Sequence, residues 1–229
     1  MPTIDEIKTL LEQCSEEEQG LIFQYLRGKF VIHPLEKQFN APAELILESI
    51  SRSPDITQRG VRGIIAEAAF RQYIIDKLAG WKDVTPSENS SSYDFLLEDG
   101  IGPVRIQVKM QRLKAGEPMS AKEGYRFLPP DKFVVETQRT RGGIDKKTSS
   151  ATRPYKFGEF DILAVSMHPS CGNWKCFLYT VADWLIPRSD NPNLLLKFQP
   201  VPRSANDEWT DNLLQCIEWF RSGEKKKIN

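Results

Sequence analysis

The sequence contains no run of apolar residues that approaches the roughly 18 needed to cross a membrane. Its start, MPTIDEIKTL, lacks the basic segment and apolar run of a signal peptide, so we expect a cytoplasmic protein with no membrane partner. Four cysteines in 229 residues form no dense pattern of the kind found in disulfide-stabilised folds. No G-x-x-x-x-G-K-[ST] segment occurs, so the chain carries no phosphate-binding loop of the ATPase type.

The sequence also has no excess of positive or negative charge, since 31 Lys and Arg balance 31 Asp and Glu. The balance is not local, because residues 103–157 contain 13 basic and five acidic side chains. A strongly basic middle third is compatible with a surface that binds phosphates. A solvated basic loop explains the same composition, so charge alone leaves both interpretations open.

The chain is long enough for one main domain with a small helical appendage. We predict a helical N-terminal region at residues 1–56, because Thr3 with Glu6 and Ser15 with Glu18 have the capping-box spacing that starts a helix. A longer helix is expected to follow, from about residue 57 to 78. We therefore place the main domain at residues 57–229.

The sequence changes character at Trp81, where short runs of strand-forming residues begin. We predict strands at residues 81–85, 93–98, 103–112, 132–138, 160–168 and 174–181. Long loops are expected at 113–130 and 139–158, and a late helix at 206–221. Strands flanked by helices in this way indicate an α/β or α+β layer arrangement.

Two neighbouring strands alternate apolar and polar side chains, YDFLLE at residues 93–98 and PVRIQVKMQR at 103–112. A period of two residues predicts a hairpin with one buried and one polar face. Residues 99–102, Asp-Gly-Ile-Gly, supply a turn with glycine where a positive φ is needed.

The register of this hairpin places three polar side chains together. If the strands are symmetric about the turn, Phe95 faces Ile106 and Asp94 faces Gln107. Lys109 lies two residues further along, on the same face as Gln107. Directly opposed Cβ atoms in a sheet are about 4.5–5.5 Å apart. The pattern therefore predicts a carboxylate, an amide and an ammonium group in one small cluster.

Glu67 interrupts a largely apolar stripe of the predicted long helix, which includes Ile64, Phe70, Ile74 and Leu78. A buried carboxylate normally needs a partner or a metal. The alternative is a glutamate at the edge of the stripe, paired with Arg71 four residues on.

The order of these residues, a helix with Glu, a strand with Asp and a next strand with Gln-x-Lys, resembles the PD-(D/E)xK nuclease superfamily. That superfamily includes most type II restriction endonucleases. The matching positions are Glu67, Asp94, Gln107 and Lys109, and the likeness covers residues 58–112 by motif and extends to about 181 by strand order. The resemblance implies an α/β fold with a central mixed β-sheet flanked by helices.

The resemblance also implies a metal site and a catalytic lysine. Mg²⁺ would be bound by Asp94, the Gln107 side-chain oxygen, the Val108 backbone carbonyl and, directly or through water, Glu67. Such a metal lowers the pKa of a water molecule and neutralises phosphate charge. Lys109 would orient that water or stabilise the crowded phosphorane.

The sequence departs from the family pattern at two positions. Tyr93 stands where the family has proline, and Gln107 stands where it more often has an acid. A glutamine removes one negative charge from the metal site, and Glu67 is positioned to restore it.

Residues 136–161 form the second informative region, because they combine basic, amide and hydroxyl side chains. Arg and Lys suit guanine edges and phosphates, and Gln suits adenine. We predict that this region contacts double-stranded DNA, with a flexible connector as the alternative. The predicted contact residues are Gln138, Arg139, Arg141, Lys146, Lys147, Arg153 and Lys156.

The leading hypothesis is a Mg²⁺-dependent, sequence-specific DNA endonuclease of the type II restriction class. A homodimer is expected because cleavage of a palindrome maps onto a two-fold axis, and a cognate DNA methyltransferase is expected in the same system. One alternative is a repair, recombination or transposition nuclease of the same superfamily. Another is a non-catalytic DNA-binding protein on a nuclease fold, which Gln107 favours. A third is a general α/β interaction domain, in which Glu67, Asp94 and Lys109 are surface charges.

Overall fold

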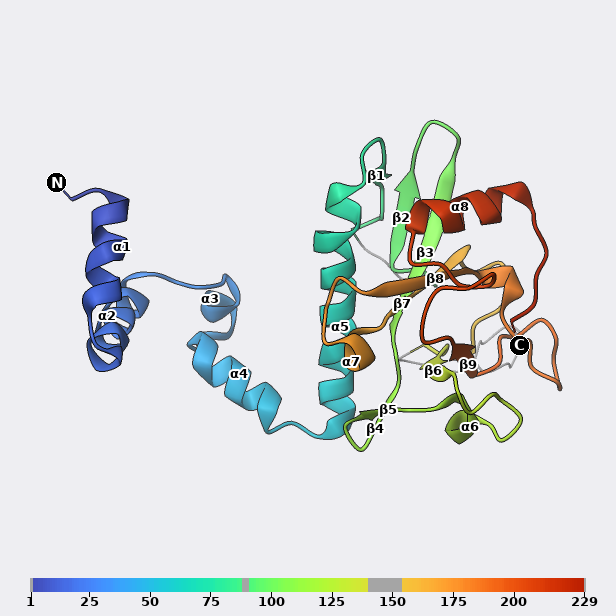
Figure 1. The fold of residues 1–229 in the computed structure, drawn as a ribbon, viewed down its shortest axis with the longest axis horizontal. Helices are drawn as coiled ribbons and strands as arrows, with labels where there is room; N and C mark the ends of the chain where they lie inside the picture. The colour runs from blue at the N-terminus through green and yellow to red at the C-terminus, as the bar shows by residue number, and fades with distance from the viewer. Residues whose placement is uncertain (1, 88–90, 140–153, 229) are drawn as a thin grey trace. The chain divides into compact units, whose positions relative to one another are not determined.

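The computed structural model of the protein describes residues 2–87, 91–139 and 154–228 (Figure 1). The chain divides into two compact units, Met1–Gln58 and Arg59–Asn229. Within the described ranges, no helix is long and apolar enough to cross a lipid bilayer.

The N-terminal unit consists of helices α1 (Ile4–Gln13), α2 (Glu16–Lys29), α3 (Leu35–Phe39) and α4 (Ala43–Ser51). Both predicted capping boxes are present. The hydroxyl oxygens of Thr3 and Ser15 each accept a hydrogen bond, at 3.3 Å, from the backbone N–H three residues on. These caps satisfy N–H groups that the first turn of a helix leaves without an intrahelical partner.

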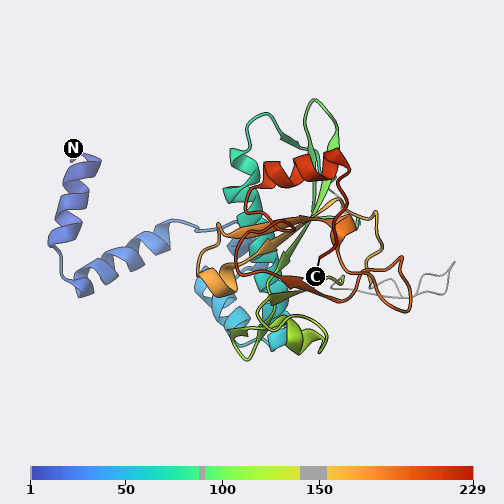
Figure 2. The ribbon, with the colours of Figure 1, turned by 45° about the vertical axis from the view of Figure 1, so that its right-hand side comes forward.

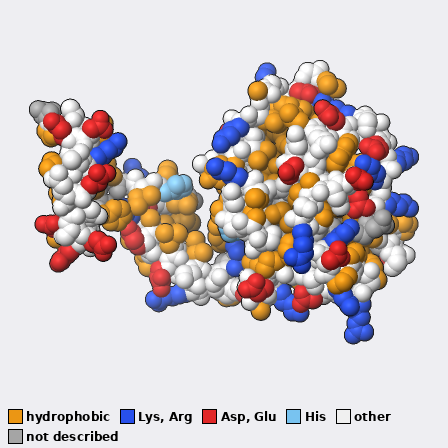
Figure 3. All heavy atoms as spheres, viewed as in Figure 1, with side chains coloured by type: hydrophobic (Ala, Val, Ile, Leu, Met, Phe, Trp, Pro, Cys, Tyr) orange, Lys and Arg blue, Asp and Glu red, His pale blue; other side chains and the backbone are white. Residues whose placement is uncertain are grey.

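The four helices of this unit contain no buried residue in the described part of the chain. Large apolar side chains such as Ile4, Phe23 and Leu47 are exposed, and Figure 3 shows hydrophobic side chains on the surface of this unit. Polar contacts hold the segments together instead. Arg27 on α2 bonds to Glu36 on α3 and, at 2.8 Å, to Glu44 on α4.

A five-stranded sheet organises the second unit, in the order β1-β2-β3-β7-β8. Its strands are β1 (Lys82–Asp83), β2 (Phe95–Glu98), β3 (Pro103–Met110), β7 (Ile162–Ser166) and β8 (Phe177–Val181). β3 and β7 run parallel and the other neighbours antiparallel, so the sheet is mixed. The predicted α/β fold with a central mixed sheet and flanking helices is confirmed.

Helices lie beside this sheet in both ribbon views (Figure 1 and Figure 2). The main ones are α5 (Asp55–Tyr73) and α8 (Leu213–Ser222), and shorter segments are η1 (Ile75–Lys77), α7 (His168–Cys171) and η2 (Ala182–Trp184). α8 begins at Leu213, later than the predicted start at residue 206. The reason is an N-cap at Asn212, whose side-chain oxygen accepts a hydrogen bond from the N–H of Leu214 at 3.0 Å.

The prediction of one long loop at residues 113–130 was wrong. This segment contains β4 (Leu113–Lys114), β5 (Glu117–Pro118) and α6 (Ala121–Gly124). β4 and β5 are joined by a tight turn with φ of 52° at Ala115 and 87° at Gly116. β9 (Phe198–Val201), which pairs with β6 (Phe133–Glu136), was also not predicted.

The hairpin of β2 and β3 has the predicted register, with Phe95 opposite Ile106. Its turn is held by Asp99, whose carboxylate accepts from the N–H groups of Ile101 at 2.9 Å and Gly102 at 3.1 Å. Gly102 has φ of 153°, a conformation that side chains disfavour. Arg221 of α8 donates two bonds to the same carboxylate, at 2.8 and 2.7 Å, so the turn is anchored to the C-terminal helix.

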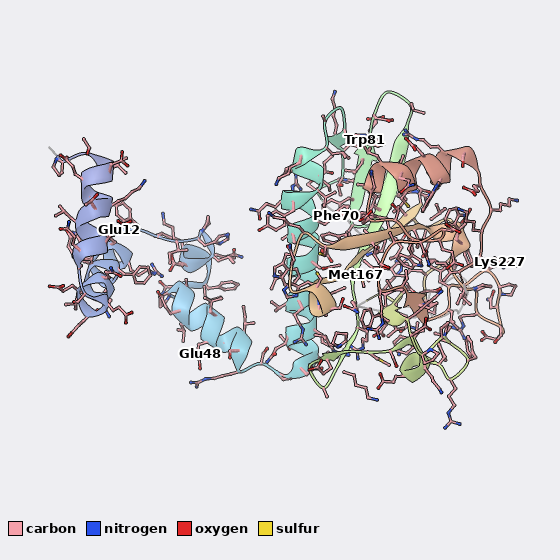
Figure 4. All side chains as sticks on the ribbon, in the orientation of Figure 1. Glu12, Glu48, Phe70, Trp81, Met167 and Lys227 are labelled. Carbon is pink, nitrogen blue, oxygen red and sulfur yellow. The ribbon has the colours of Figure 1, made fainter. Side chains whose placement is uncertain are left out.

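Phe70 connects α5 to the sheet (Figure 4). Its ring is fully buried, and its centroid lies 5.4 Å from that of Phe95 on β2 and 5.3 Å from that of Phe177 on β8. The predicted apolar stripe was wrong at Ile64, which is 65% exposed. The buried face of α5 instead follows Ala66, Ala69 and Phe70.

We predict that Phe70→Ala lowers the free energy of unfolding by about 3–5 kcal/mol, because it removes a fully enclosed ring from the helix–sheet interface. Urea unfolding measures this change. Ile64→Ala, on the exposed side of the same helix, is the matched control and should change stability by about 0.5 kcal/mol or less. Equal losses in the two variants would contradict the packing described above.

Candidate active site

The Asp94 carboxylate lies against the middle of β3. Its Oδ2 atom accepts a hydrogen bond from the backbone N–H of Val108 at 2.8 Å and another from the side-chain amide of Gln107. The Asp94 backbone N–H donates to the Ile106 carbonyl at 2.9 Å. The structure therefore brings together Asp94 and Gln107, as the hairpin register predicted.

The Gln107 amide lies where two oxygen atoms converge. Its nitrogen donates to the Asp94 carboxylate and lies 3.2 Å from the Val108 carbonyl oxygen. The side chain is 1% exposed, so these contacts replace water. For the side-chain oxygen of Gln107 to become a metal ligand, the amide must rotate by half a turn, exchanging its nitrogen for its oxygen.

Glu67 and Lys109 lie within electrostatic range of Asp94. Burial and then the negative charge of Asp94 raise the pKa of Glu67 to about 7, and the positive charge of Lys109 opposes the shift. Burial also raises the pKa of Asp94, against the effects of Lys109 and of the two hydrogen bonds from Val108 and Gln107. Two carboxylates that share a partly dry environment favour a bound proton or cation.

The alternative pairing of Glu67 with Arg71 is wrong. The Arg71 guanidinium lies 3.2 Å from the carboxylate of Asp83 on β1. The partner of Arg71 comes from another element, which the spacing along α5 does not reveal.

The donor atoms of the cluster fit a hard cation. In the part of the chain that the structure describes, no three His, Cys, Asp or Glu side chains gather as a metal site. The cluster offers two carboxylates, Asp94 and Glu67, with the Gln107 amide and the Val108 carbonyl as neutral oxygen donors. Oxygen-only ligand sets of this kind suit Mg²⁺.

Only three of the predicted DNA contacts lie in the described residues. Gln138 forms a backbone β-bridge with Pro154. The Arg139 guanidinium donates to the carboxylate of Glu159 at 2.7 Å, and the backbone N–H of Lys156 donates to the same carboxylate at 2.9 Å. Four further predicted contacts lie outside the described residues: Arg141, Lys146, Lys147 and Arg153.

Tyr155 also lies at this cluster, although the sequence did not point to it. The Lys109 ammonium nitrogen is 5.5 Å from the centroid of its ring. The two residues are far apart in the chain and belong to no common motif. The only available signal was an aromatic residue within the basic segment 136–161.

No protein-family model and no curated protein matches the chain. Among solved structures, a bacterial homing endonuclease, I-Ssp6803I, aligns with a TM-score of 0.36 and 17% sequence identity. The alignment covers 72% of this chain and 94% of that one. A likeness of this degree carries no argument about function.

We predict that Glu67→Gln stabilises the protein at pH 8 relative to the wild type, and less so at pH 5. The unfolded chain releases the Glu67 proton near pH 4.5, whereas the folded chain retains it to about 7. The free energy of unfolding of the wild type therefore falls as pH rises from about 4.5 to about 7, because only the unfolded chain has released this proton. Because solvent screens a half-buried charge, we expect a difference of about 1–2 kcal/mol between the two pH values.

Urea unfolding without divalent cations, at pH 5 and pH 8, measures this effect. Glu98→Gln is the matched control, because Glu98 is an exposed carboxylate on β2. A Glu67→Gln variant whose stability follows the wild type at both pH values would contradict the burial of this carboxylate.

Proposed function

We propose that the protein is a Mg²⁺-dependent, type II site-specific DNA endonuclease that hydrolyses phosphodiester bonds in double-stranded DNA. The observation that carries the proposal is the cluster of Asp94, Gln107 and Lys109 beside Glu67. A general interaction domain would not need two carboxylates with raised pKa values at one place, since such groups cost stability.

Asp94, Glu67, Gln107 and the Val108 carbonyl would hold the metal. When bound, Mg²⁺ neutralises phosphate charge and makes a water molecule more acidic. Asp94 is already oriented by the Val108 N–H, so its carboxylate needs little rearrangement. Glu67 would lose its proton on binding, because a nearby cation favours the carboxylate form.

Lys109 would act on the phosphate that is attacked. Its ammonium group lies close enough to Asp94 and Glu67 to influence both pKa values. A positive charge there stabilises negative charge that develops on the phosphorane oxygens. It also orients a water molecule for attack, through its N–H groups.

DNA contact is proposed for Gln138, Arg139 and Lys156, together with Arg141, Lys146, Lys147 and Arg153. The net positive charge of residues 103–157 supports this assignment. We further propose a homodimer acting in the cytoplasm beside a cognate DNA methyltransferase. The exposed apolar side chains of the N-terminal unit support association with a second copy.

We predict that the purified protein cuts plasmid DNA into discrete fragments in the presence of Mg²⁺. Asp94→Ala and Lys109→Ala should each reduce the cleavage rate about 10²–10³-fold, because each removes a charge at the reacting phosphate. Lys82→Ala, which removes an exposed lysine of β1 in the same sheet, is the matched control and should cut at the wild-type rate.

Other outcomes of this assay identify the alternatives. Unspecific degradation, or cutting of branched DNA alone, would indicate a repair or recombination nuclease. If the protein binds duplex DNA without cutting it, and Asp94→Ala leaves this binding unchanged, the nuclease proposal is contradicted. That result would indicate a non-catalytic DNA-binding protein.

We predict that Gln107→Glu binds Mg²⁺ more tightly, on the order of tenfold, because ligand charge raises affinity for a hard cation. Without Mg²⁺ the variant should be less stable at pH 8, since a third carboxylate would repel Asp94 and Glu67. Isothermal titration calorimetry measures the affinity. Gln72→Glu, the same change at an exposed position of α5, should leave Mg²⁺ binding unaltered.

A further inference from the structure

Tyr155 is a buried aromatic residue whose ring is fixed from several directions. It is 4% exposed, and its ring meets that of Phe160 edge-on, with 5.4 Å between centroids and 86° between planes. Its backbone carbonyl accepts a hydrogen bond from the N–H of Leu195 at 2.9 Å. A side chain held in this way has little freedom to move.

Two cationic side chains lie on this ring. The Lys109 nitrogen and the central carbon of the Arg139 guanidinium are each 5.5 Å from the ring centroid. A cation within about 6 Å of an aromatic centroid is attracted by the electrons of the ring. Burial raises the pKa of the Tyr155 phenol, and the charge and hydrogen bonding of Lys109 act against that shift.

A lysine at a reaction centre must have its ammonium group held in place. Its side chain is a flexible four-carbon stem that carries a strongly hydrated charge, so the strand position alone does not determine where the ammonium group lies. A misplacement of about 1 Å can cost a reaction 100-fold in rate. The ring of Tyr155 is a rigid, largely buried surface beside the ammonium end of the Lys109 side chain.

We propose that Tyr155 is the positioning residue for Lys109, holding its ammonium group at the cluster formed with Asp94 and Gln107. The ring also contacts Arg139, a proposed DNA contact. The catalytic consequence rests on the proposed nuclease function, whereas the positioning itself does not. A purely structural role, in which Tyr155 only fills the core, is the competing explanation.

The first test measures the exposure of Lys109 without any cleavage. The full-length wild type and Tyr155→Leu are treated with formaldehyde and a borane reductant, and methylation of each lysine is followed by peptide mass spectrometry. We expect Lys109 to react about two- to fivefold faster in Tyr155→Leu, the change expected from loss of one cation–π contact. Lys82 should react equally in both proteins. An unchanged rate at Lys109 overturns the proposal.

A matched control is Tyr73→Leu. Tyr73 also has two lysines on its ring, with Lys77 at 5.8 Å and Lys175 at 5.6 Å from the centroid, whereas Lys109 and Arg139 lie on the ring of Tyr155. Methylation of Lys109 should be unaffected in this variant. Faster labelling of Lys109 in Tyr73→Leu as well would reveal general loosening of the fold, and would overturn a specific role for Tyr155.

A second variant keeps the test valid if Tyr155→Leu does not fold. Lys109→Met retains the apolar stem and removes the charge. The ring resonances of Tyr155, followed at neutral pH by NMR of ¹³C-labelled tyrosine, should shift in this variant, because the positive charge near the ring is gone. Tyr155 ring resonances identical to those of the wild type overturn the contact.

Cleavage kinetics separate this proposal from the proposed function. In Tyr155→Leu we expect the kcat for DNA cleavage to fall by about 10–100-fold, with the Kd for duplex DNA in the absence of Mg²⁺ unchanged. Parallel losses in kcat, DNA affinity and melting temperature would indicate a structural role only. If the wild type cuts no DNA, the nuclease function fails, and the methylation and NMR results still decide whether Tyr155 positions Lys109.

Discussion

The Asp94 carboxylate accepts hydrogen bonds from the Gln107 side chain and from the Val108 N–H, and these bonds tie the start of β2 to the middle of β3. Both the core and the candidate active site depend on this register. It directs Ile106 and Val108 into the packed interior and Gln107 and Lys109 to the opposite face. A slip of one residue would exchange the two faces and place Gln107 and Lys109 among the apolar side chains of the interior.

The cluster around Asp94 is maintained at a cost in stability. Burial disfavours the charged forms of Glu67 and Asp94, and the nearby Lys109 offsets only part of that penalty. Structural ion pairs elsewhere in the fold are arranged differently. At the hairpin turn, two bonds from Arg221 hold the pKa of the Asp99 carboxyl well below its usual range. The pKa values of Glu67 and Asp94 are raised, as suits carboxylates that bind a cation, whereas that of Asp99 is lowered, as suits an ion pair that stabilises a turn.

The two units of the chain are stabilised by different means. The second unit has an extensive buried core, in which Phe70 joins α5 to the sheet. Helices α1 to α4 bury no described residue and are supported by capping boxes and by the ion pairs of Arg27. Isolated helices of about 12–15 residues or fewer are marginal in water. The exposed apolar side chains of this unit, such as Phe23 and Leu47, are not covered by its own packing.

Features that depend on local chemistry could be predicted from the amino-acid sequence. Helix starts at Thr3 and Ser15 follow from capping spacing, and the pairing of Phe95 with Ile106 follows from alternation about a glycine-containing turn. Two members of the candidate site, Asp94 and Gln107, could be placed together because they lie on adjoining strands of one hairpin.

Contacts between segments distant in the chain could not be predicted, because they depend on how the folded elements pack. The partner of Arg71 is Asp83, Ile64 faces solvent, and Tyr155 packs against Lys109. None of these follows from spacing along a helix or strand, because each depends on which element covers which face. Sequence periodicity defines the faces of a helix or strand, and the packing of whole elements determines what each face meets.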